Sequence, residues 1–314
     1  KDSTTRLGPR KMTEGSTEGA CDYPHLTEGV RAVAALSDDQ RRRYLDQDFF
    51  VDFASMREIR KELNQLPGLP PARKPRSFII VGESQMGKST VLEEFERDNK
   101  GDDEKESEFA RVPVLRIQFA EDGGKGLWNE LSGALNVVVP ATAAWTRHKK
   151  EVLKTIVDVE VKVFVVDEMA NMMSYSKKTQ DIALNGIKYL MNHHQRPIVL
   201  GATPEVYQVI KVDPQIRNRF KLMILRRLKP DEEMAEFLRN WEICLPLRKA
   251  SNLDEKKLMA AIHKITQGLV GDIVEALKMA AKYAIGRGEA ITVEVLDEMG
   301  WVTQDDNDEA VGSL

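Results

Sequence analysis

The chain has 314 residues, of which 42% are hydrophobic, 31% charged and 6% aromatic, a composition typical of a folded protein with one large domain or two smaller ones. The formal net charge of −4 excludes attraction of nucleic acid to the molecule as a whole, so a nucleic-acid contact would need a local basic surface or one formed by assembly. Two distant cysteines and the lack of a long apolar run argue against a disulfide framework and a membrane span, and favour a reducing cytoplasmic compartment.

The first part of the chain is predicted to be helical after a polar tail. Residues 1–20 are rich in Gly, Ser, Thr and charge, which is typical of a segment without fixed structure. A helix is predicted over residues 37–47, with Ser37 as its candidate N-cap, and a second over residues 54–66. The run from Pro67 to Pro71 ends this second helix.

From residue 77 onwards, short apolar runs alternate with helical patterns. Strands are predicted at residues 77–81, 112–119, 161–166, 197–200 and 222–225. Helices are predicted at residues 91–97, 127–135, 146–157 and 182–192. This alternation predicts an α/β fold with a five-stranded parallel sheet flanked by helices.

The last part of the chain contains no strand pattern after Pro230. Helices are predicted at residues 231–243, 254–267, 271–285 and 292–299, which would form a small helical lid. We therefore divide the sequence into an N-terminal tail and arm (1–48), an α/β core (49–228), a helical lid (229–300) and an acidic C-terminal tail (301–314).

One motif carries a specific chemistry. The sequence from Gly82 to Ser89 matches the pattern G-x-x-x-x-G-K-[ST] between a predicted strand and a predicted helix, as a phosphate-binding P-loop requires. Lys88 would reach the β- and γ-phosphates of ATP, and the Ser89 hydroxyl would ligate Mg²⁺. The predicted cofactor-binding residues are Gly82, Glu83, Ser84, Gln85, Met86, Gly87, Lys88, Ser89 and Thr90.

The third predicted strand ends in two carboxylates. An apolar run followed by Asp167 and Glu168 is the Walker B pattern. Asp167 would hold Mg²⁺ together with Ser89, and Glu168 would act as general base on the attacking water. This glutamate favours hydrolysis of the nucleotide over phosphoryl transfer to a small molecule, so that a small-molecule kinase is the disfavoured alternative.

Two further residues are predicted to act on the nucleotide. Thr203 follows the fourth strand, which would lie between the P-loop strand and the Walker B strand, so Thr203 is a candidate sensor of the γ-phosphate. Arg219 precedes the fifth strand, a place from which AAA+ ATPases commonly reach a neighbouring subunit's nucleotide, with Arg217 as the second choice. The predicted catalytic set is Lys88, Asp167, Glu168, Thr203 and Arg219.

Several stretches together resemble one family. Beside the P-loop and Walker B segments, these are Pro24-His25-Leu26, the stretch from Gln215 to Phe220, and Leu245-Pro246-Leu247-Arg248. They are similar to the TniB/TnsC transposition ATPases, relatives of MuB, over about residues 23–300. The first and last stretches are the more telling, because generic AAA+ proteins lack them.

The resemblance implies a role in a bacterial cytoplasm. Members of this family bind double-stranded DNA in the ATP state through backbone contacts, assemble on it as rings or helical filaments, and mark it as a transposition target. They recruit or activate a DDE transposase, and ATP hydrolysis disassembles them. A target-selector protein or a CRISPR effector stays open as a further partner.

The resemblance also marks candidate DNA-binding residues. Lys125 matches the lysine of the loop with which family members follow a DNA backbone. A second loop contains Thr142 and is followed by Arg147, Lys149 and Lys150. The alternative is that these are solvated surface residues. The acidic net charge leaves open a different class of function, an AAA+ loader or signalling switch that acts on protein partners without DNA.

Overall fold

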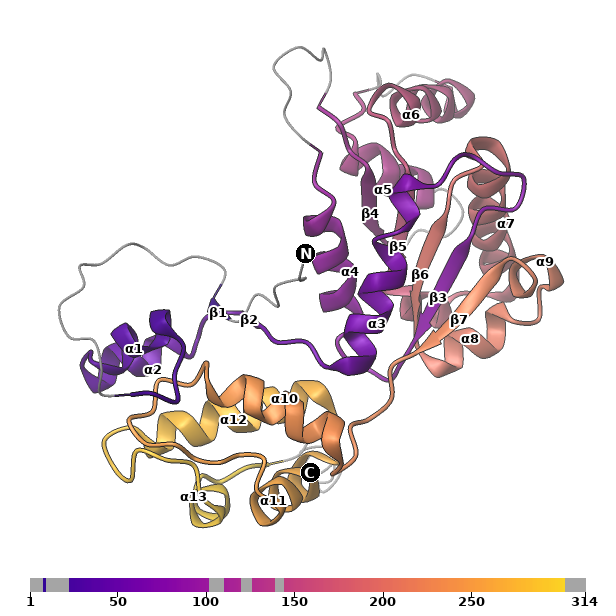
Figure 1. The fold of residues 1–314 in the computed structure, drawn as a ribbon. Coiled ribbons are helices and arrows are strands. Elements are labelled where there is room, and N and C mark those ends of the chain that lie inside the picture. Colours follow the sequence, from indigo (N-terminus) through magenta and orange to yellow (C-terminus); the bar gives the residue numbers. More distant parts are fainter. Residues whose placement is uncertain (1–7, 10–22, 102–109, 120–125, 139–143, 303–314) are drawn as a thin grey trace. The chain divides into compact units, whose positions relative to one another are not determined.

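A computed structural model describes residues 8–9, 23–101, 110–119, 126–138 and 144–302 (Figure 1). The chain forms two compact units. The core unit comprises Ser55–Arg226, and the arm–lid unit combines Lys1–Ala54 with Arg227–Leu314. The chain therefore passes between the two units twice.

The core unit is built on one sheet. Its strands are β3 (Ser77–Val81), β4 (Val114–Gln118), β5 (Val163–Asp167), β6 (Ile198–Ala202) and β7 (Phe220–Ile224). They pair in the order β4-β5-β6-β3-β7, and every pairing is parallel. All residues of β3, β5 and β6 are buried, as expected for a parallel sheet covered on both faces. The predicted fold class and the central position of β6 are confirmed.

Helices cover both faces of this sheet, and Figure 1 shows α4 and α7 on opposite sides of it. The helical elements of the core are α3 (Ala54–Leu63), η1 (Leu66–Gly68), α4 (Lys88–Asp98), α5 (Gly126–Ala134), α6 (Trp145–Asp158), η2 (Met169–Ser174), α7 (Lys177–His194), α8 (Pro204–Ile210) and α9 (Pro214–Arg217). One large apolar core joins alternate strand residues, such as Ile117 and Val166, to α5, α6 and α7. On the opposite face of the sheet, α4 packs against β4, β5 and β6.

Several helix boundaries differ from the prediction for local reasons. The helix predicted from residue 91 begins at Lys88, because Gly87 adopts the left-handed conformation that ends the loop. The helix predicted from residue 182 begins at Lys177, where the Ser176 hydroxyl accepts a hydrogen bond from the Thr179 amide. Helices α8 and α9 were not predicted; each starts with a proline preceded by a capping residue.

The arm–lid unit contains the four helices predicted for the lid and two from the N-terminal arm. The lid helices are α10 (Glu232–Glu242), α11 (Lys256–Thr266), α12 (Val270–Ala284) and α13 (Val293–Glu298). The arm forms α1 (Glu28–Ala34) and α2 (Asp38–Tyr44), and the short strands β1 (Gly8–Pro9) and β2 (Phe49–Phe50) pair antiparallel. Ser37 caps α2 as predicted, in a capping box with Gln40; α1 was not predicted.

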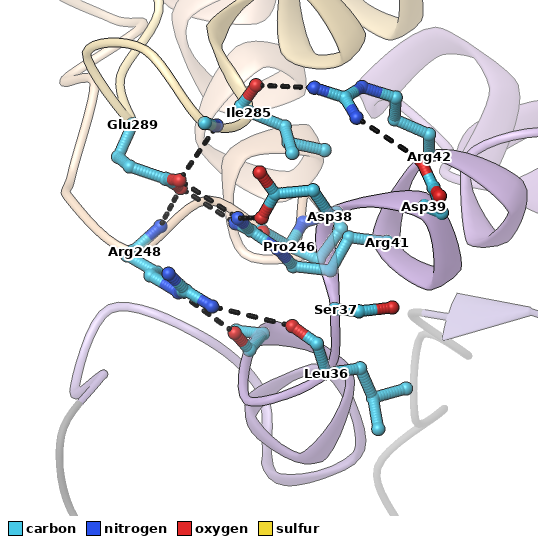
Figure 2. Close-up of polar contacts among 12 residues, drawn as sticks. Leu36, Ser37, Asp38, Asp39, Arg41, Arg42, Pro246, Arg248, Ile285 and Glu289 are labelled. Carbon is cyan, nitrogen blue, oxygen red and sulfur yellow. Dashed lines mark hydrogen bonds and ion pairs between the residues drawn. The ribbon is translucent and has the colours of Figure 1, made fainter.

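A buried ion pair holds the arm on the lid (Figure 2). The Arg41 guanidinium is fully buried and donates to both carboxylate oxygens of Glu289, at 2.6 and 2.8 Å. It also donates to the Pro246 carbonyl oxygen at 3.2 Å. In the other direction, Arg248 of the lid donates to the carbonyl oxygens of Ala34 and Leu36. The arm is thus a structural part of the lid.

The same packing brings together the two sequence stretches that most distinguish this chain. A ring nitrogen of His25 lies 3.1 Å from the Leu247 carbonyl oxygen, and the Thr27 amide donates to the Ile243 carbonyl oxygen at 3.2 Å. The Pro24-His25-Leu26 stretch and the segment 245–248 therefore form one interface, although 222 positions separate His25 from Leu247. Across the described ranges, no helix has the length and apolar character needed to span a bilayer.

Candidate nucleotide site

The loop between β3 and α4 has the backbone that a phosphate-binding loop needs. Gly87 has a φ of +81°, a left-handed conformation in which a side chain would be strained, and it starts α4 at Lys88. Met86 is fully buried, so its contribution to binding a nucleotide is limited to its backbone. Helix α4 then directs the amide groups of its first turn toward the space above the loop, where they favour an anion.

Lys88 lies folded back onto this loop. Its ammonium group donates to the carbonyl oxygens of Gly82 at 2.9 Å and Glu83 at 2.6 Å. Burial lowers the pKa of Lys88, while the negative charges of Asp167, Glu205 and Glu83 act to raise it. Phosphate oxygens would replace the two carbonyl oxygens as acceptors, with stronger charge-assisted hydrogen bonds.

The carboxylate of Asp167 is buried at the end of β5, with 2% of the residue exposed. Its Oδ1 accepts a hydrogen bond from the Glu168 amide at 2.8 Å. Gly201 of the adjacent β6 makes room for it, because a Cβ at that position would lie 2.7 Å from Oδ1. Glu168 itself is exposed and has a φ of +52°, a conformation that costs a non-glycine residue about 1–3 kcal/mol. Such strain at a strand end is typical of functional sites.

The residues present fit a magnesium ion held partly by phosphate. Within the described ranges, no group of three or more His, Cys, Asp or Glu side chains could by itself hold a metal ion. Mg²⁺ is commonly bound by one or two carboxylates together with phosphates and water. Asp167 and the half-buried Ser89 would supply the protein ligands, and the space left by Gly201 keeps the Asp167 carboxylate uncrowded.

Thr203 follows β6, so it lies at the strand end between the P-loop strand and the Walker B strand. Its hydroxyl caps α8 by accepting from the Val206 amide at 3.5 Å. A hydrogen bond from Thr203 lowers the pKa of Glu205, whose charge also acts on Lys88. Glu205 was missed in the sequence, because an acidic residue in the first turn of a helix has an ordinary capping explanation.

Arg116 is a second residue that the sequence did not identify. It comes from β4, on the sheet face that carries Asp167, and its Nη1 lies 3.8 Å from Asp167 Oδ2. Its other nitrogens pair with Glu96 at 2.9 Å and Glu93 at 3.5 Å, both on α4. The only signal in the sequence is an arginine between the apolar residues Leu115 and Ile117 of a predicted strand.

The two candidate trans arginines have different surroundings. Arg219 is half-buried and donates to Asn192 Oδ1 of α7 at 2.6 Å. Arg217 ends α9 and is exposed, and its guanidinium makes no hydrogen bond or ion pair with the part of the chain that the structure describes. Arg219 thus has a fixed position in this subunit, whereas the Arg217 guanidinium is available to another molecule.

The candidate DNA-binding residues divide into three groups. Arg147 and Lys150 are exposed on α6, one helical turn apart. The Lys149 ammonium lies 3.5 Å from the Tyr189 ring centroid and 4.6 Å from that of Trp128, and burial lowers its pKa. Its position is therefore explained by cation–π contact within the core unit. Lys125 and Thr142 lie outside the described residues.

Solved structures with a similar fold include ORC and Cdc6 proteins. The ORC2 protein of Aeropyrum pernix (ADPNP-ADP complexes) has 15% identity and a TM-score of 0.55, over 81% of this chain and 69% of that one. Cdc6p of Pyrobaculum aerophilum has 16% identity and a TM-score of 0.56, over 84% and 71%. Drosophila ORC bound to DNA has 13% identity and a TM-score of 0.54, over 91% and 70%. At these identities, the similarity concerns the fold.

No curated protein sequence matches the chain. The family model described as "Bacterial TniB protein" matches residues 41–230, which is more than half of the chain and includes the P-loop, the Walker B strand and both candidate arginines. The chain belongs to the TniB family and is an AAA+ ATPase.

Proposed function

We propose that this protein is an ATP-dependent regulator of transposition that oligomerises on target DNA. In this proposal the ATP state selects the target site and recruits or activates a DDE transposase, and hydrolysis disassembles the oligomer. The observation that carries it is the family match over the complete nucleotide site. The relatives of known fold include an ORC bound to DNA, which supports a DNA-associated role for this AAA+ fold.

The nucleotide site would act through the residues described above. Lys88 would turn from the loop carbonyls to the β- and γ-phosphates, and Asp167 with Ser89 would hold Mg²⁺. Magnesium supplies neutralisation of phosphate charge when it is bound. Glu168 would take the proton of the attacking water, and Thr203 would sense the γ-phosphate. Arg219, or Arg217 in its place, would reach the nucleotide of a neighbouring subunit.

The DNA contact would be made by phosphate-binding groups on the core unit. The exposed pair of Arg147 and Lys150 supports this role on the described surface, and Lys125 and Thr142 are the candidates from the loops. Phosphate contacts carry no sequence information, which suits a protein that accepts many target sites. Because the chain has a net charge of −4, one subunit would bind weakly, and an array of subunits would bind tightly through multivalency.

A second candidate function is favoured by the same acidic charge. An AAA+ loader or signalling switch would use nucleotide to control protein partners and would not bind DNA. The two candidate functions share the ATPase site, but in the first the ATP state binds DNA and in the second it binds other proteins.

Electron microscopy and a gel-shift assay on random duplex DNA separate these two functions. We expect rings or filaments on DNA with a non-hydrolysable ATP analogue and none with ADP. Lys88→Ala is the matched control, because it removes the phosphate contact while leaving the surface unchanged, and it should lose nucleotide binding and assembly together. Active ATPase without any DNA complex would contradict the transposition proposal and favour the protein-partner switch.

A further inference from the structure

The side chain of Arg116 connects three carboxylates at the edge of the nucleotide site. Its Nε lies 2.9 Å from Glu96 and its Nη2 3.5 Å from Glu93, while Nη1 lies 3.8 Å from Oδ2 of Asp167. The arginine side chain is 22% exposed, whereas that of Asp167 is 3% exposed. Each of the three guanidinium nitrogens therefore has a different carboxylate partner.

The partners belong to two elements that must keep a fixed separation. Glu93 and Glu96 lie on α4, whose first turn carries Lys88 and Ser89. Asp167 ends β5, the strand next to β4. A metal ion shared by Ser89, Asp167 and a phosphate would require a fixed distance between α4 and the end of β5. Among the described side chains, Arg116 pairs with acidic groups on both of these elements.

The Asp167 carboxylate is also oriented from two sides. Oδ1 accepts from the Glu168 amide at 2.8 Å, and Oδ2 faces Arg116. A backbone amide and a guanidinium thereby restrict rotation of the carboxylate about its χ2 bond. Partners of this kind fix the geometry of metal-ligating groups, and losing them typically costs roughly 10–100-fold in metal affinity.

A purely structural role is the competing explanation. Ion pairs with Glu93 and Glu96 are partly exposed, and pairs of that kind contribute little to stability. Without Arg116, however, three carboxylates would stand close to the place where a nucleotide adds further negative charge. The position of Arg116 is therefore better explained by its effect on the charge and geometry of the nucleotide site than by a contribution to the stability of the fold.

We propose that Arg116 is a positioning residue for the magnesium–nucleotide complex, which ties the Walker B aspartate to the P-loop helix. The inference rests on the nucleotide and magnesium roles proposed above. A lysine at this position would keep the positive charge but would lack the planar guanidinium group with its several donors. It would therefore not pair with carboxylates on α4 and β5 at once.

A magnesium titration of nucleotide binding tests this role without using catalytic activity. Binding of a fluorescent ATP analogue is measured against Mg²⁺ concentration for the wild type, Arg116→Ala and Arg116→Lys. We expect Arg116→Ala to raise the half-saturating Mg²⁺ concentration about tenfold, the lower end of the usual range, because the contact with Asp167 is long. Arg116→Lys should raise it by a smaller factor.

Two further variants make the result specific. Glu96→Gln removes the anchor on α4 and keeps the arginine, so it should shift the magnesium requirement in the same direction even if Arg116→Ala folds poorly. Arg111→Ala is the control, because Arg111 precedes the same strand and pairs with Glu160 at 3.5 Å, away from Asp167. We expect wild-type behaviour from Arg111→Ala.

The outcomes separate this inference from the proposed function. A half-saturating concentration that is unchanged or lower in both Arg116→Ala and Glu96→Gln, with a normal wild-type titration, overturns the positioning role alone. If nucleotide binding by the wild type did not depend on Mg²⁺ at all, the proposed magnesium site and the positioning role would fail together. A raised concentration in these variants and an unchanged Arg111→Ala control support it.

Discussion

At the scale of single residues, both the backbone conformation of Glu168 and its carboxylate support a role in hydrolysis. Glu168 adopts a left-handed conformation that costs a non-glycine residue energy, and it stands exposed beside the buried Asp167. The strain is compatible with folding because the flanking residues Asp167 and Met169 are buried. These features support the proposed role of Glu168 as the general base that acts on the attacking water.

Glu168→Gln should therefore separate binding from hydrolysis. The amide keeps the size of the side chain but cannot accept a proton, so we expect normal ATP binding and at least a hundredfold loss of phosphate release. Assemblies formed with ATP should persist on DNA. Glu205→Gln is the informative comparison, because the Glu205 charge acts on Lys88 together with those of Asp167 and Glu83. Normal hydrolysis in Glu168→Gln would rule out Glu168 as the base.

The arginine that acts across a subunit interface can be identified by mixing variants. Arg219→Ala should bind ATP and hydrolyse little, and Lys88→Ala should bind none. Lys88→Ala alone should not assemble, but its arginine can meet the ATP that an Arg219→Ala neighbour binds, so the mixture should regain activity if Arg219 acts in trans. Asn192→Ala, which removes the 2.6 Å partner of Arg219, serves as the control for position. Recovery with Arg217→Ala in place of Arg219→Ala would assign the role to Arg217.

At the scale of elements, the sequence predicts whatever depends on local pattern. The P-loop, the five strands and the lid helices can be predicted from apolar runs and from the glycines, prolines and polar residues that separate them, and the structure contains them. The ends of elements were less accurate: α4 starts at Lys88 because Gly87 has a positive φ, which no periodicity reveals. Arg116 and Arg41 were missed altogether. Each is a charged residue whose partners are distant in sequence, so its burial cannot be deduced from its neighbours.

The contact between arm and lid depends on one of these residues. Hydrogen bonds from Arg41 lower the pKa of Glu289 to about 2, with burial acting in the opposite direction. Because the folded-state pKa lies below the unfolded value near 4.5, the carboxylate stabilises the fold above that value. The stabilisation is lost as the pH falls from about 4.5 through 2. The shift corresponds to about 3 kcal/mol.

Glu289→Gln should loosen the arm at neutral pH. It removes one of the two carboxylates paired with the buried Arg41 guanidinium and leaves the partly exposed Asp38, so we expect faster hydrogen exchange in α1 and α2 and unchanged exchange in β3 and α4 of the core unit. In the wild type, the protection of α1 and α2 relative to the intrinsic exchange rate at each pH should fall between pH 4.5 and 3. Asp39→Asn, which changes an 85%-exposed partner of Arg42, should have no effect. Normal exchange in Glu289→Gln would show that the arm–lid contact does not depend on the ion pair between Arg41 and Glu289.

At the scale of the whole molecule, charge and assembly have to be considered together. The net charge of −4 opposes DNA binding by one copy, so the proposed DNA contact must combine a local basic surface with repetition of that surface along an oligomer. Arg147 and Lys150 are exposed on the same helix and supply two positive charges per subunit. Lys149, which lies against Tyr189 and Trp128, is not expected to add a third.

The double variant Arg147→Ala/Lys150→Ala tests whether α6 faces the DNA. If both side chains contact phosphates, the variant should bind duplex DNA more weakly in the presence of an ATP analogue. The slope of log affinity against log salt concentration should fall by roughly one for each lost contact. Lys256→Ala/Lys257→Ala removes the same charge from exposed positions on α11, so it controls for net charge and should keep the wild-type slope. An equal loss of DNA affinity in both double variants would mean that DNA binding depends only on the overall charge of the protein. An unchanged slope in the α6 variant alone would leave the loops that contain Lys125 and Thr142 as the remaining DNA-binding candidates.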